Sequence, residues 1–255
     1  WIASNGTPPL QLLVIFVAGT VLTRSAGCVI NDFADRNFDP HVRRTRERPL
    51  AARRVSPYEA LALFFALMLA AFWLVLQLDL ATIKLSFVAA ALAITYPFFK
   101  RFFPAPQLYL GLAFGWGVPM AFTAQLGGVP RIGWLLFVIT VLWAGVYDTL
   151  YAMVDRDDDR AIGIKSTALL FGDMDRIAIG VLQLMMLWGF LMVGSSLHFG
   201  RWYHAGVAIA ALLFAWQQWL ARHQEREACF RAFLNNNYVG LALFLGVLAE
   251  YALGR

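Results

Sequence analysis

Two groups of polar residues, far apart in the chain, have the types and spacing to bind a divalent cation. The first is Asn31, Asp35 and Asp39, and the second is Asp155 and Asp159. On a helix, side chains at i, i+4 and i+8 share one face. Like charges at this spacing repel, and Mg²⁺, which prefers carboxylate, phosphate and water oxygens, would remove that repulsion. The spacing predicts that both groups bind Mg²⁺ and that their carboxylates are catalytic.

Basic residues near these acids are candidates to hold an anion. Arg24 lies seven residues before the first group, about two helical turns inside an apolar run, where a cation is costly and usually functional. Tyr96, Lys100 and Arg101 end another apolar run, and Lys165 follows the second acidic group. Each basic residue also has a simpler explanation, as flanking charge or as a side chain that extends to the interface. Together with the acids they predict a site for a diphosphate whose organic part stays in the bilayer.

The elements that must position these residues are membrane helices. The mean hydropathy is +0.62 and only 15% of the residues are charged, against about 25% in typical globular proteins. Apolar segments of bilayer-spanning length recur, and Ser56-Pro57-Tyr58-Glu59 has the pattern of a helix start. We predict an all-α, polytopic membrane bundle that forms a single domain over residues 1–255. The eight predicted spans are 10–30, 56–78, 81–99, 107–125, 132–152, 175–197, 203–222 and 238–253. Glycines and Pro119 in the fourth of these predict a kink or close packing.

The distribution of charge predicts how the bundle is oriented. With eight spans, the loops 31–55, 100–106, 153–174 and 223–237 lie on one side, and they carry most of the 21 Lys and Arg residues. The positive-inside rule makes this side cytoplasmic, so we predict a central cavity that opens to the cytoplasmic face. The net charge of +5 is then a matter of topology, and we expect no nucleic acid partner. Cys28, in a span, and Cys229, predicted in a polar loop, suggest neither a disulfide nor a zinc site.

The motifs resemble those of a known family, over essentially the whole chain. Three of them are similar to the signatures of the UbiA superfamily of intramembrane prenyltransferases: Asn31-Asp-x-x-Asp35-x-x-x-Asp39, Tyr96-x-x-x-Lys100 and Asp155-x-x-x-Asp159. The segment 44–50, which contains Arg48, looks like the family's loop after its first motif. The segment 147–167 resembles in particular the bacterial 4-hydroxybenzoate polyprenyltransferases.

The resemblance implies nine transmembrane helices around a central cavity, in a bacterial inner membrane. It implies Mg²⁺-dependent transfer of a polyprenyl group from polyprenyl diphosphate to the carbon ortho to the hydroxyl of 4-hydroxybenzoate, in ubiquinone synthesis. Both acidic groups would hold Mg²⁺ and diphosphate. Of the other residues, Arg24, Lys100 and Lys165 would contact the diphosphate, Arg48 and Tyr96 would line the substrate site, and Arg101 would bind the aromatic carboxylate.

The start of the chain departs from this pattern, because it begins at Trp1 and the family's first helix has no counterpart. We expect N-terminal sequence to be missing, which bears on activity. Within the superfamily, the alternative is another acceptor, such as a naphthoate or haem. Outside it, the alternatives are a membrane transporter and a truncated, non-catalytic fragment. The charges gather on one face, which argues against a transporter. Beyond membrane lipid and the two substrates, no obligatory protein partner is predicted.

Overall fold

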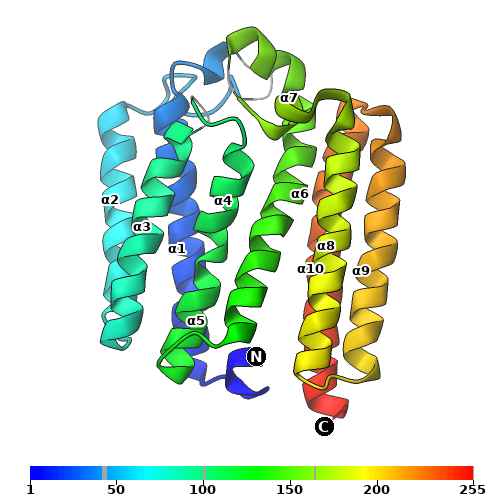
Figure 1. Ribbon diagram of the computed structural model, residues 1–255. Coiled ribbons are helices and arrows are strands. Elements are labelled where there is room, and N and C mark those ends of the chain that lie inside the picture. The colour runs from blue at the N-terminus through cyan, green and yellow to red at the C-terminus, as the bar shows by residue number, and fades with distance from the viewer. Residues whose placement is uncertain (42–44, 100–101, 164, 255) are drawn as a thin grey trace.

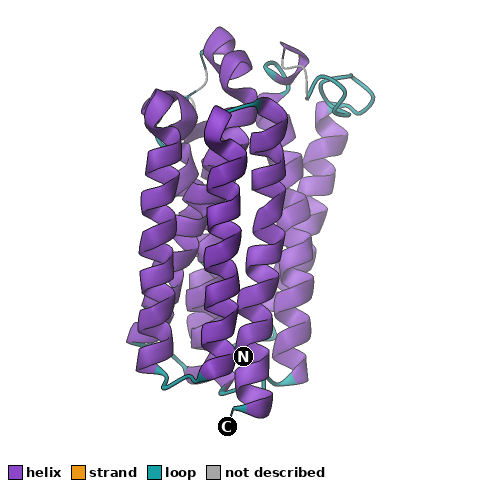
Figure 2. Ribbon diagram, turned by 90° about the vertical axis from the view of Figure 1, so that its right-hand side faces the viewer, coloured by secondary structure: helices purple, strands orange, loops and turns teal. Residues whose placement is uncertain are grey.

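The computed structural model describes residues 1–41, 45–99, 102–163 and 165–254, and within these ranges every regular element is a helix. The long helices run side by side (Figures 1 and 2), so the predicted all-α bundle is confirmed. Both termini lie at one end of the bundle (Figure 1). The other end carries the segments 36–41, 45–56, 102–105, 165–174 and 221–225, and we call it the loop end. The helices are α1 (Leu10–Asp35), α2 (Pro57–Val75), α3 (Leu80–Phe99), α4 (Pro106–Gly115), α5 (Gly117–Leu126), α6 (Arg131–Ile162), α7 (Thr167–Phe171), α8 (Asp175–Ser196), α9 (Arg201–Leu220) and α10 (Arg226–Leu253), with the short 3₁₀ helices η1 (Ile2–Ser4), η2 (Asp39–His41), η3 (Gly172–Met174) and η4 (Ala221–His223).

Six stretches of the described chain are long and apolar enough to cross a membrane, and the protein is an integral membrane protein. They are α1, α2, α3, α6, α7 with α8, and α10. The α4–α5 pair and α9 take the places of the other two predicted spans. Helix α9 has 20 residues, which corresponds to roughly 30 Å of helix. The total of eight spans remains a prediction.

The fourth predicted span is divided where the sequence suggested a kink. Helix α4 ends at Gly115 and α5 begins at Gly117, with Trp116 between them. Pro119 lacks the N–H that would donate to the carbonyl of Gly115, so the ladder of helical hydrogen bonds is interrupted here. The indole N–H of Trp116 donates to the carbonyl oxygen of Leu85 at 3.0 Å and ties the break to α3.

The prediction of a polar loop over residues 223–237 is wrong, because α10 begins at Arg226 and includes the rest of this segment. Cys229, expected in that loop, is completely buried in this helix. Two polar residues of this segment form hydrogen bonds to other helices. Asn235 accepts a hydrogen bond from Gln217 of α9 at 3.1 Å, and Asn236 accepts one from Trp143 of α6 at 3.0 Å. Polar composition here reflects hydrogen bonding inside the bundle, which stabilises membrane helices.

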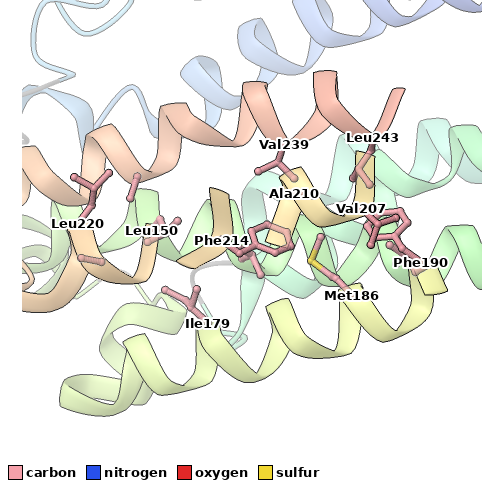
Figure 3. Close-up of a cluster of buried hydrophobic side chains, with 14 of the residues drawn as sticks. Leu150, Ile179, Met186, Phe190, Val207, Ala210, Phe214, Leu220, Val239 and Leu243 are labelled. Carbon is pink, nitrogen blue, oxygen red and sulfur yellow. The ribbon is translucent and has the colours of Figure 1, made fainter. Parts of the chain in front are cut away.

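Helix α6 joins the two halves of the bundle, because it packs against α4 on one side and against α8 and α10 on the other. The main hydrophobic core lies among α6, α8, α9 and α10 (Figure 3), where Leu150, Met186 and Val239 are almost fully buried. Helices α9 and α10 approach closely at Gly206, where an added Cβ would lie 2.8 Å from the carbonyl oxygen of Ala242. This close packing fixes α6, the helix that carries the second acidic group.

Candidate active site

A cavity of about 130 Å³ lies at the loop end of the bundle, where residues of α1, α3, α4 and α6 meet the loop-end segments. It brings together groups that are more than a hundred residues apart in the sequence. Eight of the predicted site residues line it: Asn31, Asp35, Asp39, Arg48, Tyr96, Asp155, Asp159 and Lys165.

The first acidic group lies partly on α1 and partly beyond it. Asn31 and Asp35 are one turn apart on α1, and Asp35 is its last residue. Asp39 lies in η2, after a turn in which the N–H of Phe38 donates to the carbonyl oxygen of Asp35 at 2.7 Å. The three residues therefore do not lie on one helix, which was the condition for a face shared by all of them. Asp39 precedes Pro40, and a proline disfavours helical conformation at the residue before it. Asp39 reaches the cavity through the turn instead.

Two contacts from the segment after η2 hold Asp39. Nη1 of Arg48 lies 2.8 Å from Oδ1 of Asp32 and 3.2 Å from Oδ2 of Asp39. The hydroxyl of Thr45 donates to the backbone carbonyl oxygen of Asp39 at 3.1 Å. Burial raises the pKa of the Asp39 carboxyl, and the Arg48 guanidinium and Thr45 oppose that rise. Arg48 therefore lies on the cavity wall with carboxylates as its partners.

The second acidic group lies on one uninterrupted helix, because α6 continues to Ile162. Asp155 and Asp159 are one turn apart and both line the cavity. The intervening acids do not line it: Asp157 is exposed, and Asp158 forms an ion pair of 3.4 Å with Arg226 of α10. Helical periodicity thus separates two cavity carboxylates from two that lie elsewhere.

The segment between α6 and α7 places Lys165 at the cavity. Its ammonium group donates to the backbone carbonyl oxygen of Phe102 at 2.9 Å. Behind it, the hydroxyls of Thr149 and Thr167 lie 2.7 Å apart, and the N–H of Thr167 donates to Gln107 Oε1 at 3.0 Å. These buried hydrogen bonds fix the start of α7 against α6 and α4, and with it the position of Lys165.

The other three predicted site residues are not among the described cavity residues. Arg24 does not line this cavity; its guanidinium carbon lies 5.5 Å from the ring centroid of Phe114 on α4, and Nη1 lies 3.4 Å from Sγ of Cys28. Lys100 and Arg101 fall outside the described residues. The structure therefore says nothing about their predicted contacts with diphosphate and with the aromatic carboxylate.

Sequence reasoning missed several cavity residues, of which Asp148 had a visible signal. It lies seven residues before Asp155, two turns away on the same face of α6, and it lines the cavity. An acid inside a membrane span is a functional candidate by default. Tyr151, one turn before Asp155 on the same helix, carried a similar signal and also lines the cavity. Gln107 and Thr45 line it as well, but only the tertiary structure brings these two residues to the cavity.

The donor set of the cavity suits a divalent cation together with a phosphate. Mg²⁺ takes one or two carboxylates and completes its shell with phosphate and water oxygens. In the described part of the chain, no three His, Cys, Asp or Glu side chains are close enough to form a metal site by themselves. Carboxylates outnumber basic groups among the described lining residues: the acids are Asp35, Asp39, Asp148, Asp155 and Asp159, and the bases are Arg48 and Lys165.

Comparisons with family models, with curated proteins and with solved structures all identify the same family. A model of the UbiA prenyltransferase family matches residues 1–245. A protein of Alkalilimnicola ehrlichii named 4-hydroxybenzoate octaprenyltransferase is 58% identical over 254 residues, a coverage of 100% of this chain and 87% of that protein. The apo structure of a UbiA homologue from Aeropyrum pernix superimposes with a TM-score of 0.86 at 27% identity, covering 98% of this chain and 93% of the other. A UbiA homologue from Archaeoglobus fulgidus, solved with GPP and Mg²⁺, shares the fold with a TM-score of 0.69 at 16% identity, covering 98% and 91% of the two chains. The chain belongs to the UbiA prenyltransferase family.

Proposed function

We propose that this chain is a Mg²⁺-dependent 4-hydroxybenzoate polyprenyltransferase. It transfers a polyprenyl group from polyprenyl diphosphate to the ring carbon ortho to the hydroxyl, as a step of ubiquinone synthesis, and releases diphosphate. The observation that carries the proposal is the convergence of both acidic groups with Arg48 and Lys165 on one cavity at the end of a membrane bundle. The name of the Alkalilimnicola relative supports the aromatic acceptor.

The cavity residues have distinct roles in this reaction. Asn31, Asp35, Asp39, Asp155 and Asp159 would hold Mg²⁺, which supplies Lewis-acid stabilisation of charge on the departing diphosphate. Lys165 and Arg48 would add charge-assisted hydrogen bonds to diphosphate oxygens. The proposed sites of Arg24 and Lys100 on the diphosphate, and of Arg101 on the aromatic carboxylate, follow from the family resemblance.

The reaction proceeds by ionisation of the prenyl donor. The allylic carbon–oxygen bond breaks, and the electron pair leaves with the diphosphate. The ring carbon ortho to the hydroxyl attacks the allylic cation and forms the new carbon–carbon bond, and the ring proton passes to a cavity carboxylate or to the diphosphate. Tyr96 and Tyr151, which both line the cavity, would shelter the cation with their ring faces.

The loop end would face the cytoplasm of a bacterial cell, with the bundle in the inner membrane. The support is charge asymmetry, since basic residues concentrate in the loop-end segments and cytoplasmic loops carry such an excess. Water-soluble 4-hydroxybenzoate would then reach the cavity from the cytoplasm, while the prenyl chain stays in the bilayer.

The deciding experiment is product formation by this chain in membranes, with 4-hydroxybenzoate and a polyprenyl diphosphate. We expect 3-polyprenyl-4-hydroxybenzoate with Mg²⁺ and none with EDTA. Parallel reactions with a naphthoate test whether 4-hydroxybenzoate is the acceptor. Turnover of the naphthoate in place of 4-hydroxybenzoate would refute the proposed acceptor. Undiminished turnover in EDTA would refute the proposed requirement for Mg²⁺.

A further inference from the structure

A second cleft, of about 420 Å³, opens on the outside of the bundle at the loop end, away from the candidate active site. It lies between the start of α8 and the end of α9, which stand next to each other (Figure 1). Arg176 and Gly180 line it from α8, and Gln218 and Arg222 line it from the α9 side. The proposed prenyl transfer uses none of these residues.

Each of the two arginines is exposed and held in place by neighbouring groups. Nε of Arg176 donates to Oε1 of Gln218 at 3.3 Å. The guanidinium carbon of Arg222 lies 4.0 Å from the ring centroid of Trp219, and its Nη1 donates to the backbone carbonyl oxygen of Trp219 at 2.9 Å. A guanidinium has five N–H donors in a fixed fork, which suits phosphate oxygens. Both groups are thus preorganised and keep donor capacity for an anion.

Apolar side chains continue from the cleft along α8 toward the other end of the bundle. Ile177, Val181, Leu184 and Trp188 are between 51% and 68% exposed. Their spacing of four, three and four residues places them on one face of the helix. Ile177 itself lines the cleft, so the stripe begins there. In a membrane protein such a face contacts acyl chains.

Helix α9 has a matching stripe beside it. Ile209, Leu212, Trp216 and Trp219 are between 48% and 71% exposed. The indole rings of Trp216 and Trp219 stack at a centroid distance of 4.7 Å, within the two turns that precede Arg222. Tryptophan is enriched at the level of the lipid head groups. The pair therefore places the two arginines at the depth of lipid phosphates.

The cleft also has room and net positive charge for a phosphate group. Gly180 contributes no side chain to it, and an added Cβ would come only to 3.5 Å from Nε2 of Gln218. The charged lining consists of two arginines and Asp173. The excess of one positive charge favours a head group with net negative charge over a zwitterionic one.

We infer that this cleft binds an anionic phospholipid, with the phosphodiester between Arg176 and Arg222 and the acyl chains along the stripes of α8 and α9. The inference rests on the pairing of a basic cleft with two apolar stripes that begin at it. It is independent of the proposed prenyl transfer.

The test is a titration of the full chain, purified in dodecyl maltoside, with dioleoyl phosphatidylglycerol, read by native mass spectrometry. The double variant R176Q/R222Q should bind this lipid roughly 30-fold more weakly, as expected for the loss of two basic residues at the membrane surface. The control R53Q/R54Q removes the same charge from another part of the loop end. In the parent chain, the one ion pair described between Arg54 and Glu47 is exposed, so its loss should change the stability of the fold little. The control should bind as the parent chain does.

Two further measurements make the result specific. Gly180→Leu fills the cleft without changing charge and should also weaken phosphatidylglycerol binding. Dioleoyl phosphatidylcholine and inorganic phosphate should each bind more weakly to the parent chain than phosphatidylglycerol does. Equal binding of phosphatidylglycerol by R176Q/R222Q and the parent, or an equal loss in R53Q/R54Q, would overturn the inference. So would equal binding of phosphatidylcholine. Thermal unfolding in detergent alone shows whether each variant is folded.

Discussion

Nη1 of Arg48 lies 3.2 Å from Oδ2 of Asp39, and this contact joins the loop-end segment after η2 to the first acidic group. The same nitrogen lies 2.8 Å from Oδ1 of Asp32. Arg48 thus balances part of the negative charge beside the cavity and orients Asp39, which is only 6% exposed. Its partners within the chain are carboxylates, so besides contacting the diphosphate it would act on the reaction through the position of Asp39.

Replacing Arg48 with Gln should lower activity and weaken the response to Mg²⁺. Without the guanidinium, Asp39 loses the partner that orients it, and changes of this kind beside a metal site typically cost 10–100-fold in metal affinity or activity. Initial rates measured against Mg²⁺ concentration would show a lower kcat/KM and a higher Mg²⁺ requirement. Arg53→Gln, an exposed change in the same segment, should leave both unchanged. Equal behaviour of the two variants would contradict the role of Arg48.

The two kinds of acid on α6 offer a second comparison. Asp155→Asn removes a cavity carboxylate, whereas Asp157→Asn removes an exposed one two residues away. We expect Asp155→Asn to abolish prenyl transfer and Asp157→Asn to retain near-normal turnover, measured as product formed at saturating Mg²⁺. The amide keeps the shape of the side chain, so loss of activity with retained folding points to the lost charge. Near-normal rates in Asp155→Asn would refute the proposed metal ligands.

The sequence was informative where a single helix carries the pattern. The spacing of Asp155 and Asp159 predicted that they share a face, and Ser56 and Glu59 predicted the start of α2, where both reciprocal capping hydrogen bonds form. These features depend only on local geometry. A face shared by Asn31, Asp35 and Asp39 required a helix through all three residues, and the effect of Pro40 on that helix was not weighed.

Features that depend on contacts between distant segments could not be predicted. The polar run before residue 238 looked like a loop, yet Asn235 and Asn236 make hydrogen bonds to other helices. Gln107 reaches the cavity only because α4 packs against α6 and the N–H of Thr167 donates to its side chain. Asp148 was visible in the sequence, and its place on the face of Asp155 would have identified it.

A buried ion pair lies next to the second acidic group on α6. Arg156, the neighbour of Asp155, pairs with the completely buried Asp175 at the start of α8, and Gln224 hydrogen-bonds to both. Asp175→Asn should destabilise the fold by about 3–5 kcal/mol, because it leaves a buried guanidinium without its counter-ion. Unfolding in mixed detergent and SDS micelles measures this. The double variant R156M/D175L should be less destabilised than Asp175→Asn, since it leaves no unpaired charge. A larger loss in the double variant would show that the charges themselves stabilise the fold.

Glu250 shows how an acid at the opposite end of the bundle can serve the fold alone. Its carboxylate on α10 accepts hydrogen bonds from the backbone N–H groups of Gly200, at 2.7 Å, and Tyr203, at 3.2 Å. These are orphan donors at the start of α9, which an acceptor must satisfy, and here the acceptor comes from another helix. The side chain is only 2% exposed, so water cannot replace it.

Glu250→Ala should therefore lower the free energy of unfolding by about 1–3 kcal/mol, the usual cost of leaving buried donors unsatisfied. Glu250→Gln keeps one acceptor oxygen and should fall between Ala and the parent. SDS-induced unfolding followed by circular dichroism checks both, with the exposed Glu227→Ala on the same helix as a control that changes stability by a few tenths of a kcal/mol. Prenyl transfer by folded Glu250→Ala should remain near normal, because Glu250 lies at the end of the bundle opposite the cavity. Loss of activity without loss of stability would instead connect this helix end to the reaction.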